Sequence, residues 1–236
     1  MLLRDQNIWF GAYDLTTTMN SVGIVAGRET LDKTVFTNQS RQYAPGLKTV
    51  TGQAGGFFEA VTYDQALYDA LGVVDTPFSV ADSAQTGAVA YSFKAMEGDY
   101  SPIKNSVGEL LEFSAGAVGT GDLIRGQLAM KGVTITADGN STPFQLGALA
   151  SGKKLYAVVH VTRKSGTNPT LDLLIKSDNA QGFSSPLTRI TVPQFTAIGT
   201  QWVELAGPVT DDWYRVDYDL GGTSPSFDFS VILAIQ

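Results

Sequence analysis

Cysteine is absent from this sequence of 236 residues, and the single histidine is His160. A chain without cysteine forms no disulfide, no thiolate metal site and no cysteine nucleophile. One histidine is also too few for an ordinary zinc site. We therefore expect a protein that holds no metal and no cofactor.

Charge and long hydrophobic runs are also scarce. Charged residues make up 17% of the chain, and 16 basic against 23 acidic residues give a net charge of −7. This balance predicts repulsion of nucleic acid rather than binding. No apolar run approaches the ~18 residues of a membrane span. Residues 1–7 lack the basic and apolar regions of a signal peptide. We expect no membrane contact.

Motifs for nucleotide or acyl chemistry are incomplete. Residues 147–154, GALASGKK, follow the phosphate-binding loop pattern as far as Lys154, which stands where a hydroxyl for Mg²⁺ is required. A strand pattern follows, whereas a phosphate site needs a helix N-terminus. The segment is therefore predicted to be a turn before a strand. No Gly-x-Ser-x-Gly motif accompanies His160, and we expect this histidine to be packed within a strand.

Carboxylates and aromatic residues do not form an evident active site either. Glu109 and Glu112 have an odd spacing, so they are predicted to face opposite sides of a strand. Asp217 and Asp219 share a strand face with Arg215, which indicates a solvated face with an ion pair. The sequence thus predicts a protein that is not an enzyme. Four aromatic residues are interpreted as core or interface anchors, with a sugar-stacking platform as the alternative: Trp9, Trp202, Trp213 and Tyr218.

Alternation of apolar with small or polar residues is what the chain has in abundance. This period of two is typical of half-buried strands, and it is cleanest over residues 227–235. Further strands are predicted at residues 22–27, 47–51, 89–95, 107–113, 123–130, 155–161, 171–175, 190–192, 202–205 and 214–220, with a turn at 165–169. Many strands joined by Gly- or Pro-bearing turns favour an all-β fold, either a sandwich or a barrel.

Only residues 64–71 carry the signals of a helix. Asp64 suits the N-cap position, apolar residues follow at helical spacing, and Gly72 suits the position after the helix. A helix of about two turns is not stable alone. We therefore expect it to pack on a sheet.

Three segments are predicted from these patterns. Residues 1–12 form an N-terminal arm, whose aromatic residues pack either into their own domain or onto a neighbour. Residues 13–140 form a β domain, and residues 141–236 form a β-sandwich lobe. The boundary is set by the turn formers of residues 134–142. The sequence leaves open whether the two lobes are continuous.

Between two extended segments lies a run of about fifteen residues, 32–46, without hydrophobic periodicity. Loops of ~12–15 residues without structure of their own are uncommon and usually functional or disordered. This loop carries Val35, Phe36 and Tyr43. Apolar side chains on a long loop need something to pack against, either their own domain or a neighbouring subunit.

The same region resembles the major tail tube proteins of long-tailed, siphovirus-type bacteriophages. The resemblance covers roughly residues 13–71 and lies in four short motifs: Asp14-Leu15-Thr16, Leu31-Asp32-Lys33-Thr34-Val35-Phe36, Tyr43-Ala44-Pro45-Gly46-Leu47-Lys48 and Gly55-Gly56-Phe57. In that family a strand precedes a long loop, a "PGLK" segment returns from it, and a Gly-rich strand leads to a short helix. The run Lys33-Thr34-Val35-Phe36 departs from the family's usual loop start.

The resemblance implies a virion protein that is assembled in the host cytoplasm, joins other phage tail proteins and builds the tail tube. It implies a tail-tube-like β fold, rings of six stacked subunits, or of three where each chain carries two tube-like lobes, and passage of genomic DNA through the channel without specific binding. On this basis we expect the subunit interface to include Trp9, Phe10, Thr34, Val35, Phe36, Arg41, Tyr43, Pro45 and Leu47.

A second class of function gives the same composition and strand pattern. A β-sandwich binding module, which recognises carbohydrate or decorates a viral shell, would also be all-β and acidic. A sugar module needs clustered aromatic residues on one concave face. A tube subunit needs polar, largely acidic residues on one sheet face. These two features discriminate between the alternatives.

Overall fold

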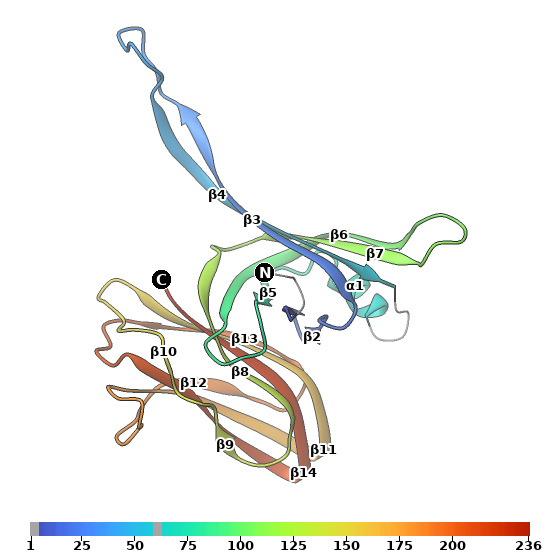
Figure 1. Cartoon of the computed structure of the whole chain (residues 1–236), viewed down its shortest axis with the longest axis vertical. Helices are drawn as coiled ribbons and strands as arrows, with labels where there is room; N and C mark the ends of the chain where they lie inside the picture. Colours follow the sequence, from blue (N-terminus) through green and yellow to red (C-terminus); the bar gives the residue numbers. More distant parts are fainter. Residues whose placement is uncertain (1–4, 59–62) are drawn as a thin grey trace. The chain divides into compact units, whose positions relative to one another are not determined.

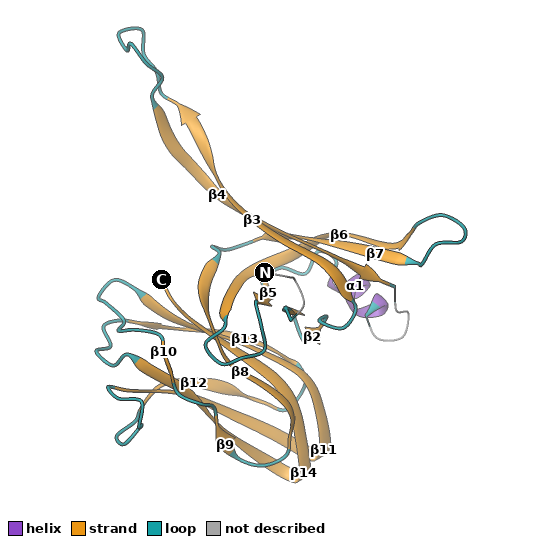
Figure 2. Cartoon of the chain, viewed as in Figure 1, coloured by secondary structure: helices purple, strands orange, loops and turns teal. Residues whose placement is uncertain are grey.

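A computed structural model describes residues 5–58 and 63–236. The prediction of an all-β fold with one short helix is confirmed, since the described residues form fourteen strands and one α-helix (Figure 2). The strands are β1 (Asn7–Phe10), β2 (Tyr13–Asp14), β3 (Met19–Asp32), β4 (Tyr43–Phe57), β5 (Thr76–Ala81), β6 (Val89–Lys104), β7 (Glu112–Gly119), β8 (Ile124–Ile135), β9 (Gly139–Asn140), β10 (Phe144–Gln145), β11 (Lys154–Asp178), β12 (Leu187–Phe195), β13 (Gly199–Ala206) and β14 (Trp213–Ile235), and the helix is α1 (Asp64–Ala70).

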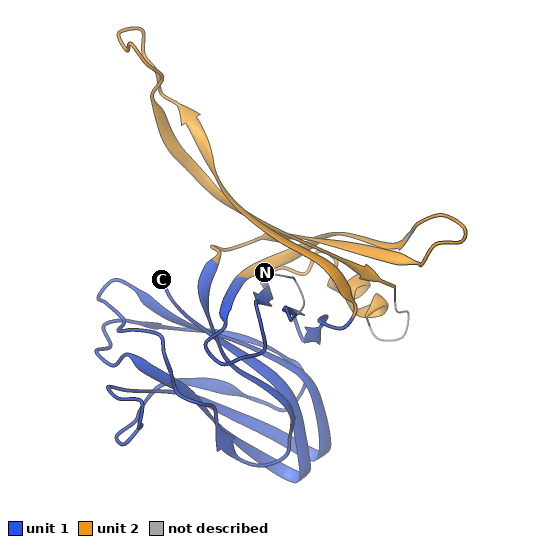
Figure 3. Ribbon diagram, viewed as in Figure 1, with its two compact units in different colours: residues 1–17, 76–92, 124–236 blue, residues 18–75, 93–123 orange. Residues whose placement is uncertain are grey.

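The chain divides into two compact units that are interleaved in the sequence (Figure 3). Unit 1 contains residues 1–17, 76–92 and 124–236, and unit 2 contains residues 18–75 and 93–123. The expected lobe boundary at residues 134–142 lies inside unit 1, because β9 and β10 both pair with β14. The chain passes between the units four times, so no single linker joins them.

Unit 1 is built on the pairing of β11 with β14. Residues 155–178 pair antiparallel with residues 213–235 along their length, and the expected alternation in both strands is confirmed by burial. The core contains one apolar face of each strand, and β12, β13 and β8 extend the pairing on either side. Its largest fully buried members include Tyr214, Phe227 and Phe229. The result is an extended antiparallel sheet with a continuous apolar core.

A bend, and not a reversal, occurs where the sequence predicts a turn at residues 165–169. The pairing of β11 with β14 continues through this region with shifts of register. Four residues there have positive φ: Gly166 (113°), Asn168 (49°), Gly222 (100°) and Ser224 (49°). A Cβ on Gly166 would stand 2.6 Å from the Ser224 carbonyl oxygen. The bend therefore needs the backbone freedom of glycine. Because glycine is also common in turns, the sequence pattern predicts a turn here.

The N-terminal residues lie inside unit 1 and do not form a free arm. β1 pairs with β5, and Trp9 belongs to a second buried cluster with Leu128 and Ile232. Trp9 is 0% and Phe10 is 4% exposed. The expectation that these two residues contact a neighbouring subunit is corrected, because their own unit encloses them. Of the two alternatives for this segment, packing into its own domain is the one observed.

Unit 2 is a sheet in the order β3-β4-β7-β6 with α1. Leu67 of α1 is buried, and Gly72, with φ 79°, follows the helix as predicted. Asp64 is the first helical residue and makes no capping hydrogen bond. Its Oδ1 instead accepts a hydrogen bond from the Tyr100 hydroxyl of β6 at 2.8 Å, which fixes the helix to the sheet.

The strand predicted at residues 107–113 is wrong for most of its length. β6 ends at Lys104 and β7 begins at Glu112, so the residues between them form the loop of a hairpin. Asn105 (φ 131°) and Gly108 (φ 97°) have positive φ, which an extended strand does not allow. The aliphatic residues of this loop imitate a strand pattern.

Candidate assembly surfaces

The most unusual element of unit 2 is the hairpin of β3 and β4. Beyond the residues of β4 that pair with β7, Thr51–Phe57, the two strands pair only with each other among the described residues. Every residue from 25 to 43 is exposed, and the hairpin projects away from the rest of its sheet (Figure 1). A two-stranded hairpin alone is marginally stable in water. This element therefore lacks the packing that normally holds a hairpin in place.

Apolar side chains occur along the whole projecting part. They are Val25, Leu31, Val35, Phe36, Tyr43 and Leu47, and each is at least 47% exposed, with Phe36 fully exposed. Single exposed apolar residues are ordinary, but a group of them on an unsupported element marks an interaction surface. The sequence could indicate this because it carries apolar residues in a segment without hydrophobic periodicity.

The tip of the hairpin is shorter and more ordered than the loop predicted at residues 32–46. Strand pairing reaches Asp32 and Tyr43, which are cross-strand partners. Thr34 donates its backbone N–H to Asp32 Oδ1 at 2.8 Å, and its own Oγ1 accepts from the Gln42 N–H at 2.9 Å. The hydrogen bonds from Thr34 lower the pKa of Asp32. The expected loop was too long because Pro45 and Gly46 in β4 resemble loop residues.

Seven of the nine residues expected at the interface lie on this hairpin. They are Thr34, Val35, Phe36, Arg41, Tyr43, Pro45 and Leu47, and all are exposed. Trp9 and Phe10 are buried in unit 1, as described above. The hairpin thus gathers the exposed part of the expected set on one element.

A second exposed apolar group lies at the β6–β7 hairpin, which the sequence did not reveal. Ile103, Val107, Leu110 and Leu111 are between 41% and 107% exposed. The adjacent carboxylate of Glu109 accepts a hydrogen bond from the Ser106 N–H at 3.3 Å. Asn105 and Gly108 were the signal available in the sequence, because both favour positive φ.

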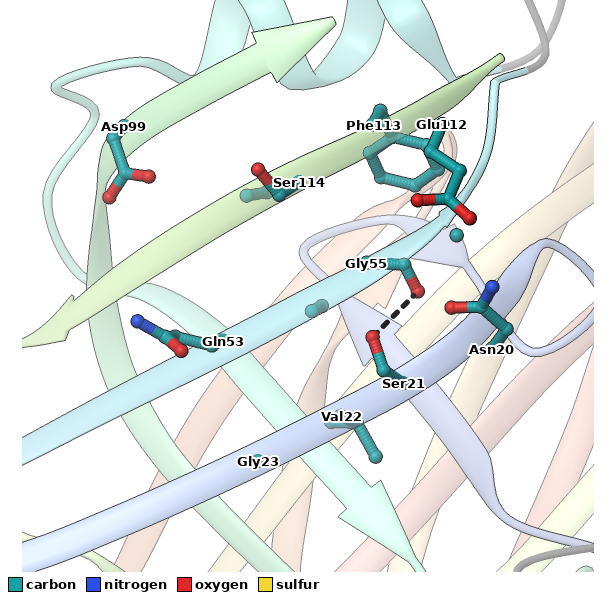
Figure 4. A pocket seen from close by; sticks show the side chains of 13 residues that line it. Asn20, Ser21, Val22, Gly23, Gln53, Gly55, Asp99, Glu112, Phe113 and Ser114 are labelled. Atoms are coloured by element: carbon teal, nitrogen blue, oxygen red, sulfur yellow. Dashed lines mark hydrogen bonds between the residues drawn. The ribbon is translucent and has the colours of Figure 1, made fainter. Parts of the chain in front are cut away.

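One face of the unit 2 sheet forms an open hollow of about 500 Å³ (Figure 4). Small residues such as Gly23, Gly55 and Ser114 line it, and the charged residues in the lining are Asp99 and Glu112. Asp99 lies over Gly116, where a Cβ would approach the carboxylate closely. The hollow is therefore lined mostly by small residues, and its charged residues are acidic.

β3 is also a free sheet edge. Among the described residues it pairs with β4 alone, so the opposite side of its fourteen residues has no strand partner. Unpaired N–H and C=O groups on such an edge are a template for a strand from another chain.

The aromatic residues do not form the platform of a sugar-binding module. Trp9 is buried, and Trp202, Trp213 and Tyr218 are half-buried. Trp202 packs edge-on against Tyr156, and Tyr218 against Phe229. Trp9 lies in a core, and Trp202 and Tyr218 pack against one, in agreement with the interpretation as core or interface anchors.

His160 is packed within a strand, as predicted, and is 0% exposed. Its Nδ1 is 2.8 Å from the Gly11 carbonyl oxygen, which only accepts, so Nδ1 carries the proton. Nε2 then accepts from the Ser79 hydroxyl at 2.8 Å, and Ser79 accepts from Ser92 at 2.7 Å. This serine–histidine pair is enclosed, and the histidine is held by a carbonyl rather than a carboxylate. A substrate has no access to it.

The other chemical motifs are resolved in the same way. Gly147 and Gly152 have positive φ in the turn before β11, and the Lys154 Nζ lies 2.7 Å from Glu204 Oε1. No group of three or more His, Cys, Asp or Glu residues is arranged to hold a metal within the described ranges. No helix in the described part of the chain is long and apolar enough to cross a membrane.

No protein-family model matches the chain, and no curated protein matches it. Solved structures with partial likeness include a chain of the virion of a native gene transfer agent particle, with 19% identity over 52% of this chain and 96% of that chain and a TM-score of 0.41. The SPP1 tail tube has 19% identity, covers 53% and 78%, and has a TM-score of 0.43.

The crystal structure of the SPP1 Dit protein, described as a paradigm of the hub adsorption apparatus in phages that infect Gram-positive bacteria, covers 99% of this chain and 100% of its own, with 13% identity and a TM-score of 0.40. All three TM-scores are below 0.5. What favours a particular function is therefore the set of exposed surfaces on this chain.

Proposed function

We propose that this chain is a structural virion protein that assembles with copies of itself into the tail tube of a siphovirus-type phage. The observation that carries the proposal is the β3–β4 hairpin, which exposes every residue from 25 to 43 and a series of apolar side chains. The resemblance of residues 13–71 to tail tube proteins supports the same function. An element built in this way gains its packing only when another molecule covers it.

The free edge of β3 supports assembly into rings. The free edge of each subunit would pair with a strand of the next subunit. If the same rotation relates each subunit to the next, these contacts are heterologous and can close into a ring. The resemblance implies rings of six, or of three where the two lobes of a chain are both tube-like. A second contact along the axis stacks these rings into a tube, and the projecting hairpin supplies that contact.

The acidic hollow of unit 2 supports a role as a channel wall. Its charged lining residues are Asp99 and Glu112, and small residues such as Gly23 and Ser114 make up much of the rest. Fixed cations on a channel wall would bind DNA phosphates and hold the genome back. In the proposed tube this face looks inward, so DNA passes without specific binding.

The proposal makes the protein a non-enzyme of the phage tail. Its partners are further copies and other tail proteins, and assembly takes place in the host cytoplasm before the tail joins the virion. The enclosed position of His160 and Ser79 supports this view. A binding module remains the competing class, although its expected aromatic platform has no counterpart among the described side chains.

Negative-stain electron microscopy of the concentrated, purified protein tests the proposal. Rings or hollow tubes of uniform diameter are the expected result. A glycan array on the same sample tests the competing class. Particles that stay monomeric at all concentrations and bind a glycan would overturn the tail tube function in favour of the binding module.

A further inference from the structure

The two exposed apolar groups of unit 2 lie at opposite ends of one sheet. β4 pairs antiparallel with β7, with Phe57 opposite Glu112 and Thr51 opposite Val118. The β6–β7 loop therefore adjoins the Phe57 end of β4, whereas the β3–β4 loop adjoins the Tyr43 end. We call these loops, residues 31–43 and 103–111, the long tip and the short tip. Fourteen residues of extended strand separate them, roughly 45 Å along β4.

The long tip is apolar and basic. Phe36, Val35 and Leu31 supply exposed apolar surface. The charged residues of the tip are Lys33, Arg41 and Asp32, a net charge of +1. The hairpin of residues 19–57 holds four basic and two acidic residues, a net charge of +2, while the rest of the chain holds 12 basic and 21 acidic residues, a net charge of −9. The hairpin is thus a basic projection from an acidic protein.

The short tip is apolar and, together with Glu112, weakly acidic: residues 103–112 hold Lys104, Glu109 and Glu112, a net charge of −1. Its most exposed aliphatic side chains are those of Val107, Ile103 and Leu110. Glu109 lies within the loop, and Glu112 follows it at the start of β7. Both tips are apolar, and their net charges are small and opposite, +1 for residues 31–43 and −1 for residues 103–112. Opposite charge of this kind is the complementarity expected of two surfaces that bind each other.

We propose that the long tip of one copy docks on the short tip of the next copy, so that the two loops are the two halves of one contact between successive subunits along an assembly. The inference rests on the proposed function, and it names the partner surface of the hairpin. Because the tips lie at opposite ends of the sheet, one molecule cannot satisfy both. The contact is therefore heterologous and propagates from copy to copy.

Repetition makes such a small contact effective. Each tip offers only a few apolar side chains, far less than the surface of a stable two-protein interface. When several copies in a ring each present a tip to the next ring, the contacts form together and their free energies combine. A single copy would bind another weakly, which leaves the ring as the unit that stacks.

Cysteine cross-linking tests the contact directly, because the chain has no cysteine of its own. Two single variants, Phe36→Cys and Val107→Cys, are mixed, assembled and oxidised. A disulfide needs its two Cα atoms within ~7 Å, so a bond between the tips forms only between copies. Leu187→Cys, at an exposed residue of unit 1, replaces Val107→Cys in the control.

The expected result is a cross-linked dimer from the mixture of Phe36→Cys with Val107→Cys, and none from the control. If microscopy shows rings or tubes but the mixed dimer is missing, the tip-to-tip contact is wrong and the proposed function stands. If no assembly forms at any concentration and the protein binds a glycan, both are overturned. Disulfides of Phe36→Cys with itself in assembled protein would indicate a symmetric contact and also overturn the inference.

A charge exchange provides an independent test. Arg41→Glu should abolish stacking because it places a carboxylate opposite Glu109, and the exposed position leaves the fold intact. The double variant Arg41→Glu with Glu109→Lys restores opposite charges and should stack again. Thermal melting checks that both variants are folded. Normal tubes from Arg41→Glu alone, or no recovery in the double variant, would contradict the proposed pairing.

Discussion

At the scale of single residues, a series of buried hydrogen bonds joins four segments of unit 1. His160 joins β11 to the turn after β1 and, through Ser79 and Ser92, to β5 and β6. Each donor in this series meets an acceptor, so the cost of burying these groups is offset. If His160 gains a proton on Nε2, for example, this nitrogen can no longer accept the hydrogen bond from the Ser79 hydroxyl.

The His160 side chain should make unit 1 sensitive to acid. Burial lowers its pKa to about 4, below its ordinary value of 6.5. The folded state therefore binds fewer protons between these values, and stability is full above pH 6.5 and falls toward pH 4, by on the order of 3 kcal/mol. Urea unfolding at pH 7.5 and 4.5 measures this. The difference between the two pH values should shrink in His160→Gln, and an unchanged difference would contradict the assignment.

Glu97 of unit 2 should have the opposite dependence on pH. Its carboxylate is 2% exposed and has no hydrogen-bond partner among the described residues. Burial, and then the nearby Asp99, raise its pKa to about 8, from 4.5. The folded state binds more protons between these values, so stability is full below pH 4.5 and is lost as the pH rises to 8.

Replacement of Glu97 by Gln removes that charge. The variant should be more stable than the natural protein at pH 9, by on the order of a few kcal/mol, and close to it at pH 5. Thermal melting at the two pH values measures the effect, with Glu109→Gln as the exposed control. A variant that is less stable at pH 9 would show that the carboxylate has a favourable partner.

Phe229 tests the core of unit 1. The residue is 1% exposed within the apolar core between the strands. Phe229→Asp buries an unpaired charge, which costs several kcal/mol, on the order of the whole stability margin of about 5–15 kcal/mol. We expect an unfolded protein by circular dichroism. Val25→Asp, at an exposed residue of β3, should melt like the natural protein, and equal melting of both variants would contradict the core assignment.

At the scale of elements, the long tip should be dispensable for folding and essential for assembly. Residues 33–42 can be replaced by Asn-Gly, a sequence that favours the tight turn between paired strands, because Asp32 and Tyr43 are cross-strand partners. The variant should remain a folded monomer, since the removed residues are exposed. Sedimentation and microscopy check this. Normal tubes from the shortened protein would exclude the hairpin as a contact between subunits.

Strands with regular alternation could be predicted from the sequence, and irregular ones could not. Residues 227–235 form the end of β14 as expected, because a buried strand imposes its period on the side chains. Residues 43–57 form a strand although they contain Pro45 and four glycines, and most of the half toward the tip is exposed. An exposed strand has no buried face, so its sequence carries no period to detect.

At the scale of the whole molecule, assembly should protect the hairpin from proteolysis. In the free protein trypsin should cut after Lys33 and Arg41, which are exposed at the tip of a hairpin without further support. In tubes both sites should resist, because a neighbouring copy covers them. Mass spectrometry of timed digests compares the two states, with protein diluted below the assembly concentration as control. Equal cleavage in tubes would place the hairpin in solvent.

The interleaving of the two units was beyond what the sequence could indicate. Composition and periodicity describe neighbours along the chain, whereas unit 1 joins Trp9 to Leu128 and Ile232. The hairpin could be located as a candidate site because it carries apolar residues without the hydrophobic periodicity of a buried strand or helix. The short tip was missed, because aliphatic residues such as Leu110 and Leu111 equally suit a strand and obscure the turn signal of Asn105 and Gly108.

The pairing of Leu155 with Ile235 has a consequence for biosynthesis. A ribosome releases the β3–β4 hairpin early, while the central sheet of unit 1 stays incomplete until residues 213–235 have emerged. Unit 1 therefore folds after translation of β14 and not progressively from its N-terminus, and the newly made chain is delayed in reaching an assembly-ready form.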